Sequence, residues 1–196
     1  MSAKPTHIET FDWRMDTLTT AEERVAKVKE YLDWGRSRAR DPKSAIPQAN
    51  ASHPGRQDWQ TFIEPYLRVH SYATTPHPTI NFRLETQPVH ANGNGNMHGG
   101  CTATLFDFCT SWPLHIIARP GFWQHLGVSR TLNCTYLRPV PIGAVIDIQC
   151  EVVQAGQKMG VTRGTMRLVE KDGSLGPVLT ICEHGKFNTD PPAPKL

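Results

Sequence analysis

The spacing of apolar residues divides the chain into a helical N-terminal part and a β-rich remainder. In the first part, apolar side chains recur at helical intervals, at Ala21, Val25, Val28 and Leu32. This spacing predicts one amphipathic helix that ends near Gly35. The four residues from Thr20 form a capping box, in which a hydroxyl and a carboxylate accept the exposed N–H groups at a helix start. We expect this helix to pack on the main domain as a structural extension.

A polar segment follows, at residues 36–57. It contains three prolines, which favour a linker or a surface loop. A short second helix is predicted from Asp58 to Tyr66. Residues 1–64 are therefore interpreted as a helical extension with its linker.

From Leu67 onward the pattern predicts two strands, one buried helix and then four strands. The expected ranges are 67–73, 80–90, 101–118, 129–137, 144–154, 159–169 and 178–188. The helix is apolar on nearly every side, which indicates burial, and Pro113 predicts a kink or an early end. Strands joined by short turns pair antiparallel, so the fold class is α+β, one helix against one antiparallel sheet. The domain is expected at 65–189, followed by a Pro-rich tail at 190–196.

Composition narrows the class of protein. The 196 residues carry a formal net charge of +3, and no basic stripe predicts a nucleic-acid partner. The five cysteines are widely spaced and form no C-x-x-C pattern, so they are interpreted as reduced residues of an intracellular protein. No apolar stretch is long enough to span a bilayer.

The first ten residues lack the apolar core of a signal peptide. We therefore expect the protein in the cytoplasm. The final tripeptide Pro194-Lys195-Leu196 is a degenerate form of a peroxisomal address, so the peroxisome is an alternative, as is the mitochondrion.

The candidate chemistry lies at the start of the predicted central helix. A run of Asn and Gly from Ala91 leads into His98, Gly99 and Gly100, and Asp107 follows within the helix. The first N–H groups of a helix lack partners and carry its positive dipole end, so they can bind an anion or a developing oxyanion. The alternative is a loop that merely needs glycines to turn.

Each candidate side chain also has an ordinary structural interpretation. His98 can be a hydrogen-bonded loop residue, Ser129 can be a plain strand hydroxyl, and Asp107 can be a helix carboxylate that faces solvent. No G-x-S-x-G elbow supports a Ser-His-Asp triad. No H-E-x-x-H spacing predicts a metal site.

The sequence resembles the hotdog-fold acyl-CoA thioesterases. The resemblance is to the His-Gly-Gly branch, related to phenylacetyl-CoA thioesterases and acyl-CoA thioesterase 13. It covers about residues 65–189 and is carried by Asn92, His98-Gly99-Gly100, Asp107, Gly127-Val128-Ser129 and the run from Leu132 to Pro139.

The resemblance implies a hotdog fold, an antiparallel sheet wrapped round one long central helix. It also implies a role for each matching residue. Asp107 would be the general base or nucleophile, and the Gly99 N–H would polarise the thioester carbonyl. Asn92 would position the water or the carbonyl, Ser129 would assist, and His98 would hold the loop.

Helix geometry predicts that the site is shared between subunits. Gly99 and Asp107 are eight residues apart, so their backbones lie roughly 12 Å apart along the helix axis. The Gly99 N–H and the Asp107 carboxylate of one protomer are therefore too far apart to reach the same carbonyl group easily. Two antiparallel helices in a two-fold dimer would place the start of one near the middle of the other. We expect a homo-oligomer, a dimer or a dimer of dimers.

The sequence thus predicts a thioesterase that hydrolyses an acyl-CoA or a carrier-bound acyl group to free acid and thiol. Coenzyme A (CoA) is part of the substrate, and no separate cofactor is expected. Arg138, Lys158 and Lys186 are candidate contacts for the CoA phosphates. A hotdog hydro-lyase or isomerase and a non-catalytic acyl-binding module are the alternatives.

Overall fold

A computed structural model describes residues 18–40 and 62–191 of the chain. Its elements are α1 (Ala21–Arg40), η1 (Glu64–Tyr66), β1 (Leu67–Ala73), β2 (Thr79–Glu85), η2 (Pro88–His90), α2 (Gly99–Cys109), α3 (Leu114–Ile117), β3 (Val128–Tyr136), β4 (Val145–Ala155), β5 (Met159–Val169) and β6 (Leu175–Phe187). The predicted order of two strands, a buried helix and four strands is confirmed.

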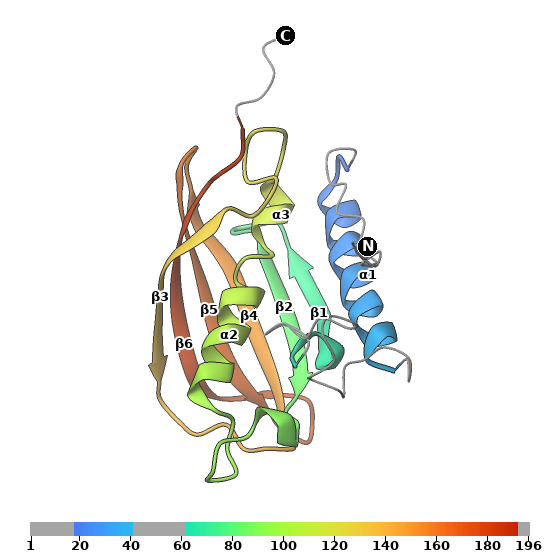
Figure 1. The fold of residues 1–196 in the computed structure, drawn as a ribbon, viewed down its shortest axis with the longest axis vertical. Coiled ribbons are helices and arrows are strands. Elements are labelled where there is room, and N and C mark those ends of the chain that lie inside the picture. Colours follow the sequence, from blue (N-terminus) through green and yellow to red (C-terminus); the bar gives the residue numbers. More distant parts are fainter. Residues whose placement is uncertain (1–17, 41–61, 192–196) are drawn as a thin grey trace, which may run out of the picture.

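The six strands form one antiparallel sheet in the order β1-β2-β4-β5-β6-β3. The sheet curves around α2, and α1 lies beyond β1 and β2 (Figure 1). This is the predicted α+β architecture, a sheet wrapped round one central helix with an N-terminal helical extension.

Helix α2 packs closely against the concave face of the sheet. Leu105 and Phe106 are fully buried, as are Phe82 on β2 and Ile148 on β4. A Cβ added to Gly164 of β5 would lie 2.5 Å from the Phe106 ring. Gly164 therefore lets the helix approach the strand, which sets how deep α2 lies in the sheet.

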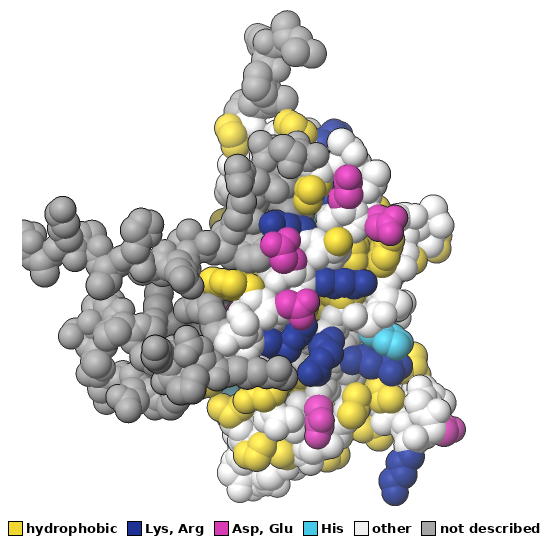
Figure 2. All heavy atoms as spheres, turned by 90° about the vertical axis from the view of Figure 1, so that its right-hand side faces the viewer, with side chains coloured by type: hydrophobic (Ala, Val, Ile, Leu, Met, Phe, Trp, Pro, Cys, Tyr) yellow, Lys and Arg dark blue, Asp and Glu magenta, His cyan; other side chains and the backbone are white. Residues whose placement is uncertain are grey.

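The opposite face of the sheet is polar. Figure 2 shows Lys and Arg side chains interspersed with Asp and Glu on one side of the molecule. Ion pairs join neighbouring strands, with Arg83 Nε 3.4 Å from Asp147 Oδ2 and Arg163 Nη1 3.6 Å from Glu151 Oε1. An antiparallel sheet with one packed and one polar face shows this alternation.

The central helix is shorter than its apolar pattern predicts. Helix α2 ends at Cys109, a turn follows, and the four-residue α3 begins after Pro113. The early end expected from Pro113 is confirmed, because a proline lacks the N–H that would continue the ladder. The predicted second strand also ends early, at Glu85 rather than His90, and Pro88 opens the short helix η2 there.

The N-terminal helix begins as predicted but ends later. The Glu23 N–H donates to Thr20 Oγ1 at 3.1 Å, and the Thr20 N–H donates to Glu23 Oε2 at 2.9 Å. The capping box is therefore confirmed. The predicted end near Gly35 is wrong, since α1 runs on to Arg40. A Cβ at Gly35 would lie 3.1 Å from Glu64 Oε2, so this glycine serves close packing of α1 on η1.

The predicted helix from Asp58 to Tyr66 lies mostly outside the described residues. Within the described part, Glu64–Tyr66 is a single 3₁₀ turn that leads directly into β1. The tripeptide Pro194-Lys195-Leu196 also lies outside the described residues. Among the described helices, none is long and apolar enough to cross a membrane.

Candidate active site

The start of α2 is capped by His98. This residue has extended backbone angles, and its Nδ1 accepts the Gly100 N–H at 2.9 Å. Its backbone carbonyl accepts the Thr102 N–H at 3.0 Å. His98 thus fixes the angle at which the chain enters the helix. The Gly99 N–H is the first of the helix and has no acceptor within the helix itself.

Asn92 organises the loop that precedes this helix. Its Oδ1 accepts the N–H groups of Asn94 at 2.8 Å and Asn96 at 3.2 Å. Its own backbone N–H donates to the Asn96 carbonyl at 2.7 Å. With the oxygen committed to the loop, the amide nitrogen of Asn92 is the part of the side chain that can donate to a substrate.

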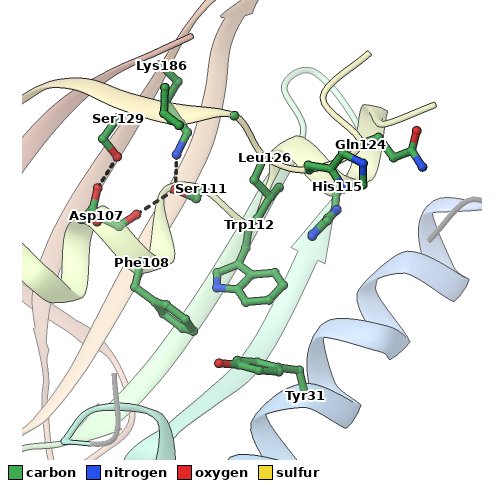
Figure 3. A pocket seen from close by; sticks show the side chains of 13 residues that line it. Tyr31, Asp107, Phe108, Ser111, Trp112, His115, Gln124, Leu126, Ser129 and Lys186 are labelled. Carbon is green, nitrogen blue, oxygen red and sulfur yellow. Dashed lines mark hydrogen bonds between the residues drawn. The ribbon is translucent and has the colours of Figure 1, made fainter. Parts of the chain in front are cut away.

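Asp107 lies in the last part of α2, with its side chain 48% exposed. Its Oδ1 accepts a short hydrogen bond of 2.6 Å from Ser129 Oγ on β3 (Figure 3). A hydroxyl that donates to a carboxylate stabilises the ionised form and fixes the orientation of the group. The structure therefore brings Asp107 and Ser129 together within one protomer.

A buried histidine approaches the same carboxylate from the sheet. His184 on β6 is fully buried, and its Nε2 lies 3.4 Å from Asp107 Oδ1. Its Nδ1 lies 2.7 Å from Thr110 Oγ1, and that hydroxyl also lies 2.6 Å from the Phe106 carbonyl oxygen. The carbonyl can only accept, so the hydroxyl donates to it and accepts from the Nδ1–H of His184.

These surroundings determine both the charge and the tautomer of His184. Burial, together with the nearby charge of Lys186, lowers the pKa of His184 from 6.5 to about 4, against the opposing effect of Asp107. The imidazole is therefore neutral at physiological pH. With the proton on Nδ1, its Nε2 presents a lone pair toward Asp107.

Lys186 lies two residues further along β6, inside the same site. It is buried, and its Nζ donates to Ser111 Oγ at 2.7 Å. Ser111 Oγ donates in turn to the Asp107 backbone carbonyl at 2.8 Å (Figure 3). Burial lowers the pKa of Lys186 from 10.5 to about 8, and the charge of Asp107 opposes that change.

These side chains border a cavity of about 550 Å³. Asp107, Ser129 and Lys186 lie at one end, Phe108, Trp112 and Tyr31 lie beyond them, and His115 and Gln124 lie at another edge, as Figure 3 shows. The lining residues are Tyr31, Asp107, Phe108, Ser111, Trp112, His115, Gln124, His125, Leu126, Gly127, Val128, Ser129 and Lys186. A carboxylate with a hydroxyl partner beside the aromatic side chains of a cavity can activate water next to an apolar group.

The sequence-predicted residues fall into separate places. Asp107, Ser129 and Lys186 line the cavity, whereas Asn92, His98 and Gly99 lie at the other end of α2 and do not. Two of the proposed phosphate contacts also lie away from it. The Arg138 Nη1 donates to the Val178 carbonyl at 2.7 Å, and the Lys158 ammonium lies 5.9 Å from the Phe187 ring centroid.

Sequence reasoning missed His184, Ser111 and Tyr31 in the cavity or beside it. The sequence did hold a signal for His184. Alternate residues of a strand share a face, and His184 lies two residues before Lys186 on β6. Ser111 lies four residues after Asp107, on the same side of a helical turn. Within the described residues, no three His, Cys, Asp or Glu side chains are grouped to hold a metal ion.

The fold agrees with comparisons to known proteins. Residues 94–173 match the family model of the thioesterase superfamily. This range runs from the loop before α2 through β5, and so includes Asp107 and Ser129. This part of the chain is therefore similar to the thioesterase superfamily, and the sheet wrapped round α2 is a hotdog fold.

Individual relatives match a shorter part of the chain at moderate sequence identity. The human acyl-coenzyme A thioesterase 13 is 33% identical over 79 residues, which is 40% of this chain and 54% of the relative. The mouse protein of the same name is 33% identical over 76 residues, 39% of this chain and 51% of its own. The matches thus span about half the length of these relatives.

A solved structure extends the likeness in fold. The zebrafish thioesterase superfamily member 2 aligns with a TM-score of 0.60 at 22% identity, covering 86% of this chain and 98% of its own. The mouse thioesterase superfamily member 2 aligns with a TM-score of 0.52 at 25% identity, covering 63% of this chain and 82% of its own.

Proposed function

We propose that this protein hydrolyses an acyl-CoA, or a carrier-bound acyl thioester, to a free acid and a thiol. The observation that carries the proposal is the Asp107–Ser129 pair, which borders an apolar cavity on the helix that begins His98-Gly99-Gly100. A thioester carbonyl needs only an oxyanion donor and a base for attack by water, and α2 supplies a candidate for each.

In the proposed reaction, Asp107 takes a proton from a water molecule as the water oxygen bonds to the thioester carbon. The carbonyl oxygen becomes an oxyanion, and the Gly99 N–H donates to it at the positive end of the helix dipole. The C–S bond then breaks, and the leaving thiolate takes the proton from Asp107. Ser129 holds the carboxylate in position, and Asn92 orients the water or the carbonyl.

The two groups are proposed to come from different subunits. Gly99 and Asp107 lie at opposite ends of the 11-residue α2, roughly 12 Å apart along its axis. Strand β3 is an edge strand that pairs only with β6 among the described strands. It also exposes apolar side chains, with Val128 50% and Tyr136 52% exposed. An edge of this kind pairs readily with a second chain, which supports a homodimer with two α2 helices side by side.

The phosphates of CoA are proposed to contact Arg138 and Lys158. Arg138 follows the end of β3, and Lys158 lies in the turn before β5. Neither lines the cavity. Lys186 is buried on Ser111, so a role beside Asp107 suits it better than contact with a phosphate. A thiol-bearing carrier remains an alternative to CoA for the same site.

The test is release of free thiol from a panel of acyl-CoAs, run for the wild type and Asp107→Asn. We expect hydrolysis by the wild type and strong loss in the variant, because the amide cannot accept the proton. If the wild type releases no thiol, or the variant matches it, the proposal is wrong. A change in substrate mass without thiol release would instead identify a hydro-lyase or isomerase.

Subunit sharing is tested by mixing two inactive proteins, Asn92→Ala and Asp107→Ala. Each mixed dimer should keep one intact site. Equal mixing should therefore restore about a quarter of the wild-type activity, since half of the dimers are mixed. No recovery after verified subunit exchange would contradict a shared site while leaving hydrolysis itself in place.

A further inference from the structure

Helix α1 contributes to the lining of the cavity, although it lies outside the residues that match the family model. Its apolar side packs in the core of the domain, where Val28 and Leu32 are completely buried. Polar bonds fix it at both ends. The Arg24 Nη1 donates to the His115 carbonyl at 3.2 Å, and the Arg36 Nη1 donates to the Leu67 carbonyl at 2.8 Å. The helix is thus held as a rigid part of the domain.

Tyr31 is the residue of α1 that reaches the cavity. Its side chain is 6% exposed. Its ring centroid lies 5.4 Å from that of Trp112 and 6.3 Å from that of Phe108. The Tyr31 hydroxyl donates to Glu64 Oε1 of η1. The ring is therefore fixed on both sides, by aromatic packing and by a hydrogen bond to a charged group.

Asp107 and Tyr31 lie on opposite sides of this space. Asp107, Ser129 and Lys186 gather at one end, while Phe108 and Trp112 lie between them and Tyr31 (Figure 3). An acyl group whose carbonyl is at Asp107 would extend its apolar chain along these two rings. Its far end would then meet the face of Tyr31.

We propose that Tyr31 is a specificity-determining residue that limits the length of the acyl chain. This inference rests on the proposed thioester hydrolysis at the same cavity. In a packed apolar pocket, a difference of one methylene changes kcat/KM by about 10- to 200-fold. A fixed ring at the end of the cavity therefore gives a sharp upper limit on chain length.

The experiment measures kcat/KM for straight-chain acyl-CoAs from acetyl to palmitoyl with the wild type, Tyr31→Ala and Tyr31→Phe. Tyr31→Ala should move the optimum to longer chains and raise kcat/KM for the first excluded length by about tenfold or more. Tyr31→Phe keeps the ring and removes the hydroxyl that donates to Glu64, so it should keep the wild-type length profile. A merely structural role would lower all lengths in proportion, and that result would overturn the inference.

Two further measurements keep the inference testable. If Tyr31→Ala does not fold, Tyr31→Trp fills more of the cavity and should move the optimum to shorter chains; an unchanged profile would overturn the inference. If the wild type hydrolyses no thioester, the proposed function fails separately. Thermal stabilisation by free fatty acids of increasing length then replaces kcat/KM. Longer acids should stabilise Tyr31→Ala more than the wild type, and equal or absent stabilisation would overturn the inference.

Discussion

The buried imidazole of His184 should make the stability of the protein depend on pH. Because burial lowers its pKa to about 4, the folded protein leaves His184 neutral down to about that pH. The unfolded chain binds a proton near the ordinary value of about 6.5. Between these values the unfolded state holds more protons, so the free energy of unfolding decreases as the pH falls from about 6.5 to about 4.

The expected magnitude follows from the size of the change in pKa. The full difference between the two values corresponds to about 3 kcal/mol. Between pH 7 and pH 5, His184 should account for a loss of about 2 kcal/mol. That is a measurable part of the 5–15 kcal/mol typical of a folded domain. His184→Gln removes the titrating group while keeping a polar side chain that can reach Thr110.

Urea unfolding followed by tryptophan fluorescence at pH 7 and pH 5 measures the effect. The His184→Gln protein should lose about 2 kcal/mol less than the wild type between these pH values. His115, whose pKa burial lowers to about 3, titrates in both proteins and cancels in the comparison. His70→Gln, at an exposed position on β1, controls for removal of a histidine. An equal loss in the wild type and His184→Gln would refute the reasoning.

Three further predictions concern the site and α1. Ser129→Ala should lower kcat/KM for thiol release by about tenfold to a hundredfold, because a hydrogen bond to a charged group such as Asp107 contributes about 1.5–3 kcal/mol; unchanged kinetics would show that Ser129 is a plain strand hydroxyl. In the wild type, kcat/KM should decline above about pH 8 as Lys186 on Ser111 loses its charge, and a decline that persists in Lys186→Met would assign it to another group. Thr20→Ala should lower the free energy of unfolding by about 1 kcal/mol, and no change in urea unfolding would mean that α1 does not unfold with the domain.

Much of the fold could be predicted because its signals are local. Strand alternation, turn residues and the apolar helix gave the order of elements, and the hydroxyl of Thr20 gave the start of α1. Gly35 misled the prediction for a physical reason. A glycine can end a helix or allow close approach, and only the position of Glu64 against α1 shows which it does here.

The site could be predicted only in part. Asp107 and Ser129 are 22 residues apart, and their pairing was expected only from the resemblance to the hotdog thioesterases. The position of Tyr31 beside the cavity could not be predicted from the sequence, because the spacing of apolar residues in an amphipathic helix does not show which cavity the helix will border. That contact depends on where α1 docks, which residues of η1 and α3 determine.

Strand β6 shows why the sequence alone does not determine the surroundings of a lysine in a strand. Lys186 is a candidate phosphate contact from the sequence because the CoA phosphates need positive charge and its strand could face the mouth of the site. The buried positions on β6 alternate through Thr180, Cys182, His184 and Lys186. His184 and Lys186 therefore share the face that packs on α2 and the turn after it, where the hydroxyls of Thr110 and Ser111 provide hydrogen-bond partners for them. Two polar side chains in a run otherwise suited to a core are stable there only if hydrogen-bonding groups meet them. The alternation of a strand, combined with one carboxylate on the facing helix, is thus the sequence signal that would locate a buried polar site of this kind.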